Sequence, residues 1–162
     1  MNQPELQRTE DFDLIEKMAR EIWYHHYVPM IGLDQVDYML DKFYRKEALE
    51  YQRKEGQEFW LIGFDAENCG YIGVSRQNPN EYFIHKFYLH TGKHRKGIGS
   101  KAFTQLTEFY NDATIIRLQV NINNFKSINF YFKCGFTIEK RLVLEIGGGY
   151  VMDDYIMIWK RP

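Results

Sequence analysis

The stretch His94-Arg95-Lys96-Gly97-Ile98-Gly99-Ser100 decides the fold class of this sequence. An aromatic and apolar run over residues 82–89 precedes it and predicts a largely buried strand. Apolar residues recur at helical spacing after Gly97, which predicts a helix to about Asp112. Backbone N–H groups at a helix start hold phosphate oxygens, and glycines let a ligand approach the chain closely. The stretch therefore indicates a cradle for a phosphorylated cofactor at a strand-to-helix turn.

Two glycines one residue apart also mark ordinary tight turns, so this signal needs a second one. The dinucleotide fingerprint asks for a third glycine in the helix, and the sequence has none there. The P-loop asks for Gly-Lys-Ser or Gly-Lys-Thr after four intervening residues, which is also absent. The cofactor is thus expected to be of a different phosphorylated kind.

Length and charge narrow the class of protein. The chain has 162 residues, of which 44% are hydrophobic, and this suits one domain over residues 1–162. Its 21 basic and 22 acidic residues give a formal net charge of −1, which argues against a nucleic-acid partner. Any attraction for anions must be local.

The two cysteines, Cys69 and Cys134, lack the spacing of a metal site or a disulfide framework. Each is expected to be a small core residue, and we expect no metal. The sequence also shows no signal peptide and no run of eighteen apolar residues, so we expect a cytoplasmic protein without a membrane partner.

The periodicity of the sequence predicts an alternation of helices and strands that makes a mixed α/β sheet flanked by helices. The expected order is a helix near residues 12–22, a helix over residues 36–56, strands at 59–64, 70–75 and 82–89, a helix at 98–112, a strand at 114–120, a helix at 125–133, and strands from 136 and over 150–159.

Residues 118–136, which read LQVNINNFKSINFYFKCGF, carry the second signal. They match the pattern Leu-x-Val-x-x-x-Asn-x-x-Ala-Ile-x-x-Tyr-x-x-x-Gly-Phe, with Ser127 in place of the alanine. Together with the glycine stretch, this segment resembles the GNAT superfamily of acyl-CoA-dependent N-acetyltransferases, and the likeness is sharp over residues 85–136. The resemblance implies an α/β (α+β) fold: a mostly antiparallel sheet of about six to seven strands, with a central splayed parallel pair and about four helices.

The resemblance also implies acetyl-CoA as the acyl donor, lying between the two splayed strands. Main-chain groups that the splay leaves unpaired would bind its amide-rich arm, and the helix start would bind its pyrophosphate. The implied cofactor-binding residues are Phe87, Tyr88, Leu89, Arg95, Lys96, Gly97, Ile98, Gly99, Ser100, Asn124 and Tyr131. His94 departs from the Gln or Arg usual in the family, and Asn124 has the further expected role of capping the next helix.

Two catalytic residues follow from the same resemblance. Tyr131 would be the general acid that protonates the leaving thiolate, although an aromatic residue on this helix can also simply pack on the sheet. His85 stands where many members have a glutamate, so it is the candidate base for the incoming ammonium, and a hydrogen-bonded strand histidine is the alternative. Glu81 is a weaker substitute.

The acceptor is expected to be a primary amine of a small molecule. Trp23, Tyr24 and Tyr27 are the candidate substrate-binding residues, and Asp153-Asp154 flanks the same region, because rings and carboxylates suit a cation. The run over residues 152–157 loosely resembles bacterial polyamine acetyltransferases, which raises that substrate class. Two alternatives stay open: the acceptor is a protein or peptide amine, or the protein is a non-catalytic acyl-CoA sensor. A homodimer is also possible from the sequence.

Overall fold

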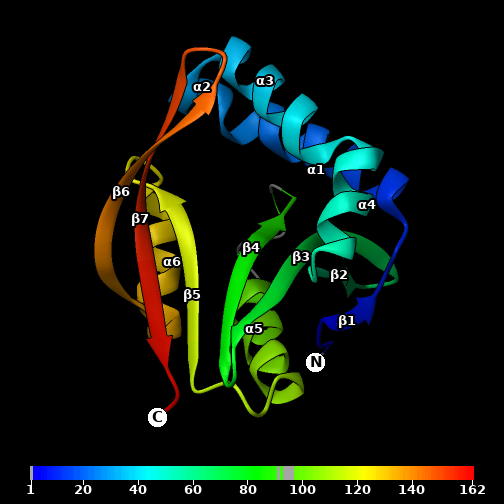
Figure 1. Ribbon diagram of the computed structural model, residues 1–162. Coiled ribbons are helices and arrows are strands. Elements are labelled where there is room, and N and C mark those ends of the chain that lie inside the picture. The colour runs from blue at the N-terminus through cyan, green and yellow to red at the C-terminus, as the bar shows by residue number, and fades with distance from the viewer. Residues whose placement is uncertain (1, 91, 93–96) are drawn as a thin grey trace.

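The structure, a computed structural model, describes residues 2–90, 92 and 97–162. Within them the chain forms one seven-stranded sheet in the order β1-β2-β3-β4-β5-β7-β6, with helices on both faces (Figure 1). The strands are β1 (Glu5–Arg8), β2 (Glu58–Phe64), β3 (Glu67–Asn78), β4 (Glu81–Leu89), β5 (Ile115–Asn121), β6 (Thr137–Gly147) and β7 (Tyr150–Lys160). The helices are α1 (Phe12–His26), α2 (Val28–Ile31), α3 (Leu33–Tyr44), α4 (Lys46–Lys54), α5 (Ile98–Phe109) and α6 (Phe125–Cys134).

The expected mixed sheet is confirmed, because every strand pair is antiparallel except β4 with β5. The structure adds β1 and α2, which the sequence analysis did not anticipate. The single helix expected over residues 36–56 divides at Arg45, whose backbone is extended, into α3 and α4. No helix in the described part of the chain is long and apolar enough to cross a membrane.

Two hydrophobic cores lie on opposite faces of the sheet. One forms where α5 and α6 cover the sheet, and the other forms where α1, α3 and α4 cover it. Cys69 is buried in the first core and Cys134 packs at its edge; neither of them forms a disulfide. Phe109, the last residue of α5, is 51% exposed and packs edge-on against Trp60.

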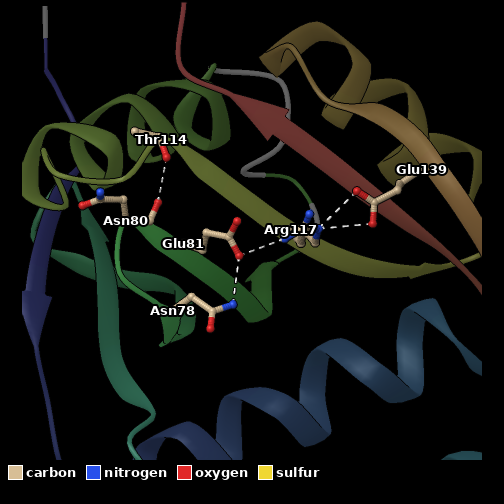
Figure 2. A network of polar contacts seen from close by, with 6 residues as sticks. All are labelled: Asn78, Asn80, Glu81, Thr114, Arg117 and Glu139. Carbon is tan, nitrogen blue, oxygen red and sulfur yellow. Dashed lines mark hydrogen bonds and ion pairs between the residues drawn. The ribbon is translucent and has the colours of Figure 1, made fainter.

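The parallel pair is closed at one end and open at the other. Its register runs from Glu81↔Ile115 to Ile84↔Leu118 and stops there, and beyond this point the strands diverge (Figure 1). Figure 2 shows what holds the closed end: the Arg117 guanidinium on β5 contacts Glu81 on β4 at 3.4 Å and Glu139 on β6 at 3.2 Å. Glu81, the weaker candidate base, thus belongs to an ion-pair network at the closed end.

A bulge in β4 sets which side chains face the α1–α4 side of the sheet. Gly73 pairs with Lys86 and the next β3 residue, Val74, pairs with Ile84, so His85 is an extra residue. Ile84 therefore faces the α5–α6 core, whereas the aromatic ring of Tyr88 packs on the α1–α3 side. Bulges redirect side chains in this way and are common beside active sites.

The β6–β7 hairpin reaches over to α3 and closes one side of the molecule (Figure 1). The Tyr38 hydroxyl donates to the Ile146 carbonyl at 2.9 Å, and the Gln35 amide donates to the Val151 carbonyl at 2.9 Å. Gly148 has a left-handed φ of +62°, and a Cβ there would come within 2.8 Å of the Tyr38 ring. Glycine is thus required both by the backbone and by this close approach.

Candidate active site

A narrow slot of about 20 Å³ opens between β4 and β5 where their pairing ends. Main-chain groups of β4 beyond Ile84 and of β5 beyond Leu118 are not paired with each other, so their facing edges can bind a ligand's amides. Phe87 and Tyr88 lie in the wall of this slot, and so do Asn124 and Tyr131 of the second motif. The structure therefore brings the two sequence signals to one place.

Helix α5 is the next described element after β4, and its two glycines are needed for different physical reasons. Gly97 is left-handed with a φ of +66°, and a Cβ there would meet no atom within 4 Å. Gly99 is buried, and a Cβ there would come within 3.0 Å of the Phe130 ring on α6. Gly97 thus leaves the open approach expected of a phosphate cradle, whereas Gly99 serves close packing between two helices.

The structure describes some of the other residues predicted to bind the cofactor, and these differ in exposure. Ile98 is fully buried in the core, so only its backbone is available to a ligand, and Ser100 is exposed on the first turn of α5. Leu89 packs against the same core. Arg95 and Lys96, together with His94, lie outside the described residues.

Asn124 caps α6, as the sequence predicts, because its Oδ1 accepts a hydrogen bond from the Ser127 backbone at 3.3 Å. Its Nδ2 donates to the Tyr27 hydroxyl at 3.4 Å, which ties the slot to helix α1. The side chain is 1% exposed, so this amide is a rigid part of the slot wall.

Tyr131 lies on α6 with 9% of its surface exposed, between the Phe87 and Phe136 rings. Burial, followed by the nearby Tyr27 and Cys134, raises the pKa of its phenol well above the ordinary value, so the hydroxyl stays protonated at neutral pH. Among the described residues no side chain or backbone group hydrogen-bonds this hydroxyl, which leaves it free to donate into the slot.

A second, larger cavity of about 810 Å³ lies on the α1–α4 side of the sheet. It borders the slot, since the same residues line both: Tyr27, His85, Lys86, Tyr88, Gln119 and Val120. The β6–β7 hairpin closes the far side of this large cavity through Ile146 and Met152. A molecule in the large cavity can therefore reach a group held in the slot.

His85 is exposed to the large cavity, and its Nε2 lies 2.6 Å from the Ser75 hydroxyl. Burial of the rest of the ring, and then the neighbouring Lys86, lower the pKa of His85 to about 4. The imidazole is therefore neutral at physiological pH. In the tautomer that donates Nε2–H to Ser75, its Nδ1 is free to accept a proton.

The three candidate acceptor-binding residues on α1 divide into two groups. Trp23 and Tyr27 are one helical turn apart and both line the large cavity. Tyr24 points elsewhere because it lies about 100° further around the helix. It is 37% exposed, and its hydroxyl bonds Asp37 on α3. Tyr24 therefore does not line the large cavity.

The sequence analysis did not single out Lys86, Gln119 or a distinct role for Asp154. Lys86 stands in the middle of an aromatic and apolar strand, and a charged residue in such a run is the signal that could have revealed it. Gln119 alternates with the buried Leu118 and Val120, which puts it on the opposite, cavity-facing side of β5. Its amide donates to Asp154 Oδ2 at 2.8 Å.

Diverging parallel strands, a helix that starts on a left-handed glycine beside them and a buried, protonated tyrosine define the class of acyl-CoA-dependent acyltransferases. Residues 16–136 match the acetyltransferase (GNAT) family. The chain belongs to this family of acetyltransferases. No curated protein matches it.

Solved structures with the same fold cover almost the whole chain. A PaiA N-acetyltransferase from Thermoplasma acidophilum, in complex with coenzyme A, is 22% identical with a TM-score of 0.78 over 98% of this chain and 99% of its own. A GCN5-related N-acetyltransferase from Rhodopseudomonas palustris is 14% identical with a TM-score of 0.80, over 99% and 98%. A spermidine N-acetyltransferase from Vibrio cholerae, in complex with CoA and spermine, is 16% identical with a TM-score of 0.66, over 98% and 95%.

Proposed function

We propose that this protein transfers the acetyl group of acetyl-CoA to a primary amine of a small molecule by direct attack. One observation carries the proposal: the β4–β5 slot, lined by Tyr131 and Asn124, shares a wall that includes His85 with the large cavity. A donor in the slot and an acceptor in the cavity would meet at their shared wall.

The residues present fit acetyl-CoA. The free edges of Phe87 and Tyr88 can bond the amides of its arm, and the open, left-handed Gly97 at the start of α5 suits its pyrophosphate. Acetyl-CoA supplies the acetyl thioester to this site.

Tyr131 and His85 would share the two proton transfers. His85 Nδ1 accepts the proton of the incoming ammonium, directly or through water, because the ring is neutral and faces the cavity. Tyr131, protonated and free to donate, gives its proton to the thiolate that leaves. Asn124 fixes the position of Tyr27 beside them through its amide.

The cavity favours a small acceptor over a protein side chain. Helices α1 and α3 and the β6–β7 hairpin, which is bonded to α3 through Tyr38, bound it on the outer sides. A volume of about 810 Å³ lies in the range of small-molecule sites.

Release of free thiol from acetyl-CoA over a panel of diamines, amino acids, aminoglycosides and peptides tests the proposal. Tyr131→Phe should lower kcat by roughly a hundredfold or more while the affinity for CoA stays within about twofold. Tyr110→Phe, a buried tyrosine bonded to Trp60 away from the slot, is the matched control. Unchanged turnover in Tyr131→Phe would remove it from the mechanism, and CoA binding without turnover of any amine would point to a sensor.

A further inference from the structure

Lys86 is a buried cation without a carboxylate partner in the described part of the chain. It is 6% exposed, and its ammonium donates to two amide oxygens, Gln52 Oε1 and Gln57 Oε1, each at 2.6 Å. The Gln52 amide is fixed in this orientation because its Nε2 donates to the Phe43 carbonyl at 2.9 Å. The Tyr44 and Phe59 rings lie 5.5 and 5.3 Å from the ammonium.

This environment suits a positive charge but does not neutralise it. Amide oxygens and ring faces stabilise a cation, yet two acceptors leave the third donor position of an ammonium unused. Lys86 also lines the large cavity. A buried charge without a counter-ion is costly, and an anionic group of a ligand would compensate it.

Asp154, which also lines the large cavity, is a buried carboxylate without a cationic partner among the described residues. It lies on β7, is 4% exposed, and accepts one hydrogen bond from the Gln119 amide. Its neighbour Asp153 is paired with Arg141, whereas no described cation lies within ion-pair distance of Asp154. Asp154 is also close enough to Tyr27, at the junction with the slot, to act electrostatically on its phenol.

The large cavity therefore carries two buried, opposite charges that are not paired with each other. They come from well-separated parts of the sheet, β4 for Lys86 and β7 for Asp154, with β5 between them. A ligand with both charges can compensate both. The cavity's other carboxylates, Glu55 and Glu145, are exposed to solvent, so the buried charges dominate. A polyamine would compensate Asp154 but would place another cation near Lys86.

We propose that the acceptor is an amphoteric molecule of the amino-acid type, whose ammonium engages Asp154 beside the slot and whose carboxylate engages Lys86. This inference rests on the proposed small-molecule amine acceptor and narrows it. It assigns acceptor selection to two charged side chains, one on β4 and one on β7.

Equilibrium binding to the full chain in the presence of CoA tests this inference without chemistry. The probes are three matched amines, an ω-amino acid, its primary amide and the diamine, compared over a series of chain lengths. At the best length the ω-amino acid should bind about tenfold or more tightly than the amide, and the diamine should bind most weakly. Lys86→Met should remove the advantage of the carboxylate, and a cooperative urea denaturation curve for this variant should show that the fold is intact.

Lys42→Met is the control for the loss of one cavity lysine, because the Lys42 ammonium is already bonded to the Ile146 carbonyl. It should keep the carboxylate preference. A diamine that binds most tightly, a preference that survives Lys86→Met, or no binding of any ω-amino acid would each overturn the inference. If the protein acetylates amines but shows no preference for a carboxylate, this inference is wrong and the proposed acetyltransferase activity is not affected. If it binds ω-amino acids selectively but acetylates none of them, the proposed activity is wrong and the inferred ligand class is not affected.

Discussion

His85 and Lys86 are neighbours in sequence, and both face the large cavity because the β4 bulge interrupts the alternation of side chains. Burial lowers the pKa of Lys86 to about 7, whereas partial desolvation of the cavity-exposed His85, followed by the charge of Lys86, lowers the pKa of His85 to about 4. At neutral pH the histidine is therefore a neutral proton acceptor, and the lysine is held close to its titration point. The protonation state of each of these two residues is thus set by its surroundings in the cavity wall.

The lowered pKa of His85 predicts the pH at which activity is lost on the acidic side of the pH–rate profile. A protonated imidazole cannot accept a proton, so kcat/KM should fall as the pH drops through about 4, well below the ordinary histidine range near 6.5. His85→Gln should lower kcat/KM by about a hundredfold and remove this limb. The exposed His25→Gln is the control. A limb that persists at the same pH in His85→Gln would count against His85 as the base.

At the scale of elements, the β6–β7 hairpin and α3 form the outer boundary of the large cavity. Their contact depends on glycine, because Gly147 and Gly148 lie against the Tyr38 ring and hydroxyl with left-handed backbones. Gly149 has a similar φ of +79° and open space where a Cβ would be. Gly148 therefore combines a left-handed backbone with a close contact to Tyr38, whereas Gly149 has only the left-handed backbone.

We expect Gly148→Ala to destabilise the protein by about 2–4 kcal/mol, as backbone strain and overpacking add. Gly149→Ala should cost only the strain, about 1–2 kcal/mol. Chemical denaturation of both variants measures the difference, and Gly148→Ala should also raise KM for the amine. Equal losses of stability would show that the Tyr38 contact contributes nothing.

For the whole molecule, burial of Lys86 links stability to pH. The pKa of Lys86 is about 7 in the folded chain, against 10.5 for an ordinary lysine, so between these two pH values the unfolded chain binds more protons. The free energy of unfolding should therefore rise with pH across this window, by up to a few kcal/mol from this group alone. Below about pH 7 the folded chain carries the full cost of a buried ammonium.

Urea denaturation at several pH values from about 7 to about 10 measures this slope. Lys86→Met should flatten it and make the protein more stable at the lower end, because the buried charge is gone. Lys42→Met should leave the slope as it is in the unmodified chain. A slope that Lys86→Met does not change would mean that Lys86 is not the group that titrates.

The sequence by itself determined the features that short-range physics controls. The spacing of apolar residues predicted most helices and strands, the Asn124–Gly135 segment carried its own cap and stop, and the left-handed Gly97 marked the start of α5. Two motifs in order predicted the family and the slot with Tyr131. These signals are local because a helix start or a strand alternation depends on residues a few positions apart.

Only the tertiary structure decided what depends on contacts between distant segments. It assigned Gly99 to packing against Phe130, turned Tyr24 toward Asp37, and placed Glu81 in the Arg117 network. It also put Lys86 and Asp154 on separate walls of one cavity, although they are far apart in the sequence. No periodicity predicts such a meeting, because it depends on the strand order and on the single-residue bulge in β4.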